Sequence, residues 1–189
     1  MLANPDFAER LYAIMLYLVT ARGNQFISAN ISSAVFRQLP EGFMDFLLNA
    51  KRNTYAGGTG KRAPVLDGSV QLEFSDSIFL YRDIYFGSAY FIGQEVVYYM
   101  GAPVWSLSYS GGLTGSSMDG GSIYTFLKEA LLRPDPQFPV RGPSRYQSRG
   151  MAYENIVNGD IWRFHGTEQI MLDDKVVYDL HYGGGLVRQ

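Results

Sequence analysis

Alternation of apolar and polar residues predicts strands along most of the chain after residue 69. Val70, Leu72 and Phe74 alternate with polar neighbours, a pattern typical of a half-buried strand. Three more segments have the composition and length of strands: residues 78–84, 89–100 and 104–109. A tight turn with glycine and proline separates the last two, and the chain returns to strands after Tyr153.

Helical spacing predicts three helices elsewhere in the chain. The first covers residues 6–21, the second begins at Pro40 and runs through Arg52, and the third covers residues 122–133. The most apolar run of the first helix, residues 11–19, is too short for a membrane span, which needs about 20 residues. We therefore expect no membrane association, and a first helix that is buried or forms a dimer contact.

The chain also matches itself at an offset of 73 residues. Residues 91–113, written over residues 164–186, share nine identical positions without a gap, among them Glu95 over Glu168. The physical interpretation is a β-meander used twice, at residues 81–113 and 153–186, with aromatic side chains on one face of each copy. Two such units could pack on each other or extend one sheet.

These elements predict an α+β fold with N-terminal helices, two repeat-related antiparallel β-meanders and an intervening helix. Residues 1–39 are expected to be an N-terminal helical extension, and residues 40–189 a single α+β domain. A length of 189 residues fits one such domain. Apolar residues make up 47 % of the chain and charged residues 18 %, which excludes intrinsic disorder.

Charge and cysteine content narrow the class of protein. The chain has no cysteine, which excludes a disulfide scaffold and a thiolate metal site. A net charge of -2 argues against direct binding of nucleic acid through its phosphates. Because no secretory signal pattern is present, a cytoplasmic location is expected.

Several motifs together resemble a bacterial and archaeal family of uncharacterised domains: residues 54–56, 81–87, 91–97 and 103–105. The resemblance covers roughly residues 40–187. Members often occur C-terminal to an Xre-type helix-turn-helix DNA-binding domain, and the resemblance implies no particular reaction. Residues 1–39 have few basic residues and one strong helix, so they do not read as a helix-turn-helix. The chain therefore looks like the stand-alone form of the family.

Glu95 and Glu168 are the candidate catalytic residues, because they match in the repeat. Two carboxylates brought together could act as general acid and general base, as in a glycosidase. The alternative is that both are ordinary strand residues, exposed or paired with arginine. Spacing along the chain does not give the carboxylate separation that the mechanism needs.

Aromatic residues crowd the first copy of the repeat, and small-molecule pockets are typically apolar and aromatic with a few polar groups. The proline- and arginine-rich segment 134–150 could close over an anionic ligand or be held to the domain by salt bridges. The candidate ligand-binding residues are Tyr81, Asp83, Tyr85, Trp105, Tyr109, Arg141 and Arg145.

The sequence favours a non-enzymatic ligand-sensing or interaction domain with an aromatic-lined pocket and a regulatory role. A small-molecule ligand and a homodimer are the expected partners. The alternative is a small hydrolase or ribonuclease-like enzyme that uses a strand glutamate and loop arginines. The two histidines, His165 and His181, do not match a metal-ligand motif, so neither a metal nor a cofactor is expected.

Overall fold

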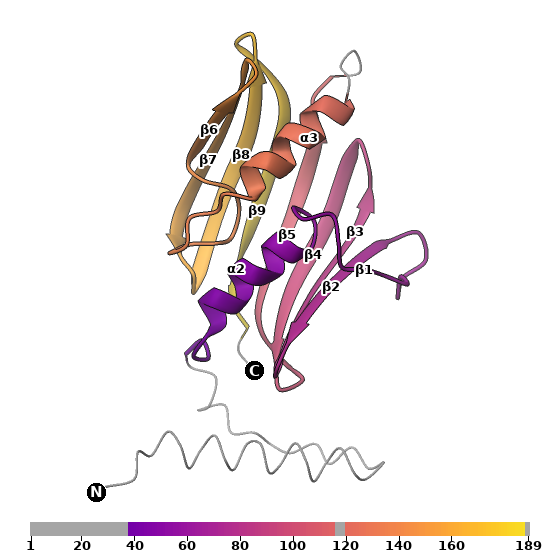
Figure 1. The fold of residues 1–189 in the computed structure, drawn as a ribbon, viewed down its shortest axis with the longest axis vertical. Coiled ribbons are helices and arrows are strands. Elements are labelled where there is room, and N and C mark those ends of the chain that lie inside the picture. The colour runs from indigo at the N-terminus through magenta and orange to yellow at the C-terminus, as the bar shows by residue number, and fades with distance from the viewer. Residues whose placement is uncertain (1–37, 116–119, 188–189) are drawn as a thin grey trace, which may run out of the picture. The chain divides into compact units, whose positions relative to one another are not determined.

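The computed structural model describes residues 38–115 and 120–187, in which nine strands form one antiparallel sheet (Figure 1). The strands are β1 (Lys61–Arg62), β2 (Val70–Asp76), β3 (Phe79–Gly87), β4 (Tyr90–Tyr99), β5 (Ala102–Leu113), β6 (Arg145–Ser148), β7 (Met151–Asp160), β8 (Arg163–Leu172) and β9 (Lys175–Leu186). Their order across the sheet is β1-β2-β3-β4-β5-β9-β8-β7-β6. The sheet therefore consists of two runs of consecutive strands that meet at β5 and β9.

The junction between β5 and β9 joins two three-stranded meanders, β3–β5 and β7–β9. The strands pair in antiparallel fashion with Tyr109 opposite Tyr182, so the sheet is continuous across the junction. Of the two arrangements that the sequence left open, the meanders extend one sheet rather than pack face to face. Internal repetition itself stays a prediction from the sequence match.

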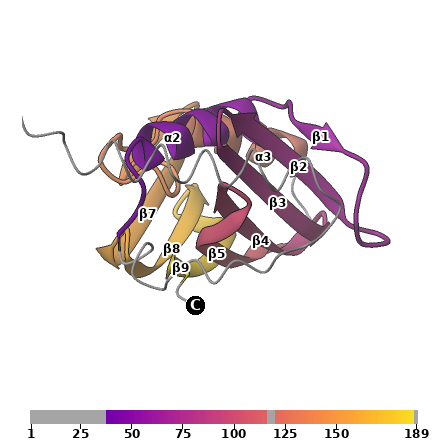
Figure 2. The same cartoon turned by 90° about the horizontal axis from the view of Figure 1, so that it is seen from below.

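Two helices, α2 (Phe43–Asn53) and α3 (Gly120–Leu131), lie against the concave face, and the sheet curves around them (Figure 2). Each helix buries one apolar stripe: Phe43, Phe46, Leu47 and Ala50 in α2, and Ile123, Phe126, Leu127, Ala130 and Leu131 in α3. Neither helix, nor any other in the described ranges, is long and apolar enough to span a membrane.

The expected α+β class is wrong, because the described residues form mainly one nine-stranded antiparallel sheet with two short helices. The end of β5 was predicted too early, because glycines in the sequence were interpreted as a loop. β5 continues through Gly111 to Leu113 instead of ending at Tyr109. A Cβ at Gly111 would lie 2.3 Å from the carbonyl oxygen of Asp179 on β9, so the glycine permits a close strand pairing. The helix predicted at residues 6–21 lies outside the described residues.

The core fills the space between the concave face and the helices and is rich in aromatic side chains. Trp105 is fully buried and stacks on Phe164 of the other meander, with ring centroids 5.7 Å apart. Phe43 of α2 packs on the same indole with a centroid separation of 6.0 Å. Large buried rings of this kind contribute much of the apolar area that stabilises a domain. They tie both meanders and α2 into one core.

Candidate ligand-binding site

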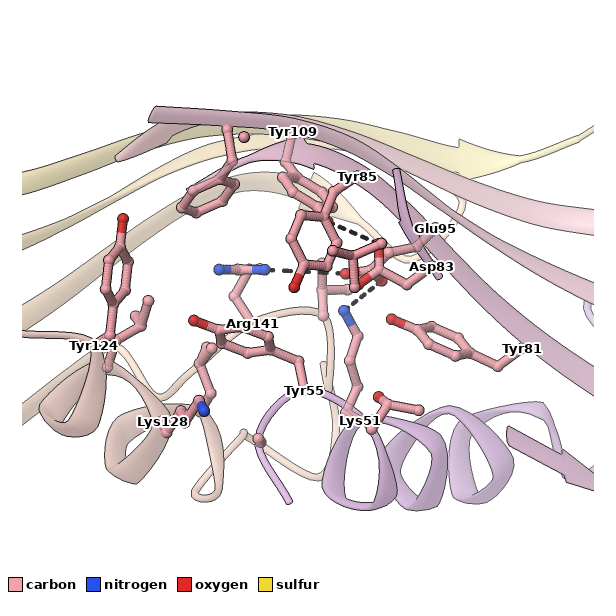
Figure 3. Close-up of a pocket in the computed structure, with 18 of the residues that line it drawn as sticks. Lys51, Tyr55, Tyr81, Asp83, Tyr85, Glu95, Tyr109, Tyr124, Lys128 and Arg141 are labelled. Carbon is pink, nitrogen blue, oxygen red and sulfur yellow. Dashed lines mark hydrogen bonds and ion pairs between the residues drawn. The ribbon is translucent and has the colours of Figure 1, made fainter. Parts of the chain in front are cut away.

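A cavity of about 370 Å³ lies between strands β3–β5 and the two helices (Figure 3). β3 contributes Tyr81, Asp83 and Tyr85, because alternate residues of a strand point to the same face. The opposite wall comes from the helices and the segments beside them, with Lys51, Tyr55, Tyr124, Lys128 and Arg141. The exposed turn at Gly87 and Ser88 also lines the cavity and marks where it meets solvent.

Two buried carboxyl groups, those of Asp83 and Glu95, lie at the inner end of the cavity. They occupy directly opposite positions on β3 and β4, and the two residues are 4 % and 2 % exposed. The Tyr109 hydroxyl donates a hydrogen bond of 2.7 Å to Oδ1 of Asp83. A Cβ at position 93 would lie 2.3 Å from that hydroxyl oxygen, so Gly93 gives the Tyr109 side chain room to reach Asp83.

The environment of Asp83 favours its protonated form. Burial, and then the neighbouring Glu95, raises the pKa of Asp83 to about 7, although the hydrogen bond from Tyr109 opposes the change. Glu95, in contrast, forms an ion pair with Lys51, whose Nζ lies 2.5 Å from Oε2 of Glu95. Burial lowers the pKa of Lys51, and the Glu95 charge opposes that effect. Asp83 is thus a carboxyl group that can hold or release a proton near neutral pH.

Glu168, the candidate catalytic partner of Glu95, is fully buried and does not line the cavity. Arg141 contacts both of its carboxylate oxygens, and the hydroxyls of Tyr153 and Tyr178 donate hydrogen bonds of 2.7 and 2.9 Å. Burial alone would raise the pKa of Glu168, but Arg141 and these hydrogen bonds hold it below its usual value. Glu168 therefore anchors Arg141, whose Nη1 lies 3.9 Å from Oε1 of Glu95.

The structure brings most of the predicted site residues together. The cavity is lined by Glu95, Tyr81, Asp83, Tyr85, Tyr109 and Arg141. Trp105 instead lies in the core, where its indole N–H donates a 3.1 Å hydrogen bond to the Ile161 carbonyl. The Arg145 side chain is 67 % exposed and pairs with Glu154 on the neighbouring strand.

Sequence reasoning missed the residues that α2, the turn after it and α3 contribute to the cavity, such as Lys51, Tyr55 and Lys128. One signal was present. Lys51 stands four residues after Leu47, on the otherwise apolar face of α2, where a charged side chain needs a partner. That partner, Glu95, is 44 positions away along the chain, which no local pattern reveals.

The described residues offer no site for a metal ion. Within 38–115 and 120–187, no group of three or more His, Cys, Asp or Glu side chains is placed to hold one. In the same residues, every buried side-chain nitrogen or oxygen has a hydrogen-bond partner. The cavity therefore presents organic functional groups, chiefly a carboxyl group, phenols and cationic nitrogens.

A family model described as a domain of unknown function (DUF5680) matches residues 83–187. The matched segment carries Asp83, Glu95, Tyr109 and Arg141, whereas Lys51 precedes it. No curated protein and no solved structure matches the chain. Because the match spans more than half of the chain, this protein belongs to the DUF5680 family of domains of unknown function.

Proposed function

We propose that this domain binds a small molecule in the cavity between strands β3–β5 and the helices, without chemical conversion of the ligand. The main support for this proposal is the position of Asp83, a buried carboxyl group at the closed end of a cavity with aromatic walls. Cavities of roughly 300–1,000 Å³ with apolar walls and a few convergent polar groups are typical of ligand sites. The volume of about 370 Å³ falls in that range.

The cost of this arrangement to stability supports a role in binding. Burying a carboxyl group without full hydrogen bonding is unfavourable, and so is leaving space beside large apolar rings. Glu168 shows how the same sheet satisfies a carboxylate for stability, with Arg141 and two tyrosine hydroxyls around it. Asp83 has only the Tyr109 hydroxyl as a side-chain hydrogen-bond partner among the described residues. A ligand in the cavity would add contacts to the Asp83 carboxyl group beyond the one from Tyr109.

A regulatory use of this binding rests on the family resemblance rather than on geometry. Relatives that carry a helix-turn-helix domain would use such a cavity to couple the binding of a metabolite to the binding of DNA. Where the domain and a DNA-binding domain are separate chains, the same event would act on a separate partner. A pull-down with the purified domain, with and without the ligand, would test this coupling once a ligand is known.

Ligand-observed NMR with a mixture of aromatic fragments tests the binding function. Ser88 is exposed at the cavity opening, so Ser88→Trp would obstruct it. Ser75→Trp is the matched control, because Ser75 is exposed on β2 and does not line the cavity. We expect fragments to bind the wild type and Ser75→Trp but not Ser88→Trp. Binding that is equal in all three proteins, or absent from the wild type, would overturn the proposal.

A second candidate function is a small hydrolase or ribonuclease-like enzyme. Asp83 favours it, because a cavity carboxyl with a pKa of about 7 opposite a second carboxylate suits general acid–base work. The test is to incubate the protein with labelled RNA and with a panel of chromogenic glycosides. Turnover that Asp83→Asn abolishes would support the enzyme and displace the binding function.

A further inference from the structure

The loop between α3 and β6 (residues 132–144) covers the concave face of the second meander beside Asn155. The equivalent position on the first meander, beside Asp83, faces the cavity. The backbone N–H of Gly142 donates a 3.1 Å hydrogen bond to the Tyr153 hydroxyl, and Nδ2 of Asn155 donates a 3.1 Å bond to the Gly142 carbonyl. A Cβ at Gly142 would lie 2.7 Å from the Tyr153 hydroxyl oxygen, so the loop lies directly on this face.

The first meander presents matching register positions to the cavity instead of to a loop. Asp83 opposes Glu95 as Asn155 opposes Glu168, and each half has a tyrosine that donates to the first of these residues. Asn155 uses its amide N–H to bind the loop carbonyl, whereas an ionised carboxylate at Asp83 can only accept. The open position therefore suits a group that donates a hydrogen bond.

Charge balance identifies the kind of donor. At the inner end of the cavity, Lys51 is paired with Glu95, and Arg141 with Glu168. No ion pair joins Asp83 to a cation in the described ranges. At that end, ionised Asp83 thus leaves one negative charge in excess, which a ligand carboxylate would double and a protonated nitrogen would neutralise. The remaining cation of the lining, Lys128, lies over the Tyr55 ring, with its Nζ 5.3 Å from the ring centroid.

The walls of the cavity suit a cation on a flat apolar body. Phe91 is the centre of a cluster of rings, with centroids 6.4 Å from Tyr85, 5.9 Å from Tyr109 and 6.4 Å from Tyr124. All four side chains line the cavity. Aromatic faces attract ammonium groups and stack with flat ligands, and both effects strengthen away from water.

We propose that the cavity selects alkylamines that carry an aromatic ring, in their ammonium form, with the nitrogen donating to Asp83, and rejects the same ring carrying a carboxylate. This inference rests on the proposed binding function and adds the ligand class to it. The titratable and charged groups that line the cavity with Asp83 are Tyr81 and Tyr85 from β3, Glu95 from β4, Tyr109 from β5, Lys51 from α2, Tyr55 from the turn after α2, Tyr124 and Lys128 from α3, and Arg141 from the loop.

Three probes with one ring test the inference: benzylamine, benzyl alcohol and benzoate. Their dissociation constants are measured by NMR titration at about pH 8, where Asp83 is ionised. We expect benzylamine to bind best, and its affinity to fall at least about tenfold in Asp83→Asn, because a charge-assisted hydrogen bond is lost. Benzoate binding should not weaken in that variant, and Ser88→Trp should abolish benzylamine binding.

A measurement on the wild type alone covers the case that Asp83→Asn fails to fold. Benzylamine stays protonated at about pH 5.5, where Asp83 is protonated too, so its affinity should fall there while that of benzyl alcohol does not. Two results would overturn the inference but leave the binding function standing. One is that benzoate binds as tightly as benzylamine. The other is that the affinity for benzylamine changes neither with pH nor in Ser88→Trp. No binding by any probe or fragment would overturn both.

Discussion

Arg141 binds Glu168 through two nitrogens, with Nε 3.0 Å from Oε2 and Nη2 in contact with Oε1. The same guanidinium directs Nη1 toward Glu95 at 3.9 Å. The Arg141 side chain thus lies between two carboxylates, that of Glu168 on β8, which is fully buried, and that of Glu95 on β4, which lines the cavity. Glu168 positions Arg141, and Arg141 forms part of the cavity wall.

Removing the charge of Glu168 should destabilise the fold strongly. Glu168→Gln leaves the Arg141 guanidinium buried without its partner, and breaking a buried ion pair typically costs about 3–5 kcal/mol. Glu154→Gln is the matched control, because Glu154 pairs with Arg145 at the surface, where an ion pair contributes about 1 kcal/mol or less. Urea denaturation of both variants measures the free energies of unfolding. Equal losses in the two variants would contradict the anchoring role of Glu168.

A methyl group at Gly93 should displace the Tyr109 ring from Asp83. The new Cβ would lie 2.3 Å from the Tyr109 hydroxyl oxygen and 2.7 Å from the Cβ of Tyr85. Overpacking of this kind costs about 1–3 kcal/mol, so Gly93→Ala should lower the midpoint of thermal unfolding. Gly115→Ala is the control, because nothing lies within 4 Å of its added Cβ. A Gly93→Ala variant as stable as the control would show that the ring is not held over Gly93.

The stability of the wild type should depend on pH through Asp83. Its pKa is about 7 in the folded protein, raised by burial and by Glu95, against 3.8 for the free side chain. Between these values the unfolded chain has lost the proton that the folded protein keeps. The free energy of unfolding should therefore fall as pH rises from about 4 to about 7 and then level off.

Comparison with Asp83→Asn separates this effect from the titrating groups far from Asp83, because those groups are unchanged in both proteins. Relative to the variant, the wild type should lose up to about 4 kcal/mol across this range, given about 1.4 kcal/mol per pKa unit. Urea denaturation at a series of pH values measures the difference. A difference that stays constant with pH would mean that Asp83 keeps an ordinary pKa.

Strand positions were largely predictable, because alternation with a period of two is a local signal. Val70, Leu72 and Phe74 gave the centre of β2, and helical spacing placed α2 within a few residues. The strand lengths were not predictable, since Gly111 reads as a loop residue until its close approach to β9 is known.

The strand side of the cavity was more predictable than its helix side. Tyr81, Asp83 and Tyr85 share one face of one strand, so a pattern in the sequence groups them. Trp105 satisfies the same rule but lies under α2, where Phe43 covers it, which only the helix position decides. The placement of Lys51 and Tyr124 in the same cavity as Asp83 depends on the curvature of the sheet around the helices, which residue patterns do not encode.

The most direct test of ligand binding is a methyl NMR map of the wild type with a mixture of aromatic fragments. Leu127 and Val140 line the cavity, whereas Ile92 and Ile156 are exposed side chains that do not, which gives internal controls within one spectrum. Ligand binding in the cavity predicts chemical-shift changes at Leu127 and Val140 and none at Ile92 and Ile156. Changes confined to the two isoleucines, or no change at any of the four residues, would contradict it.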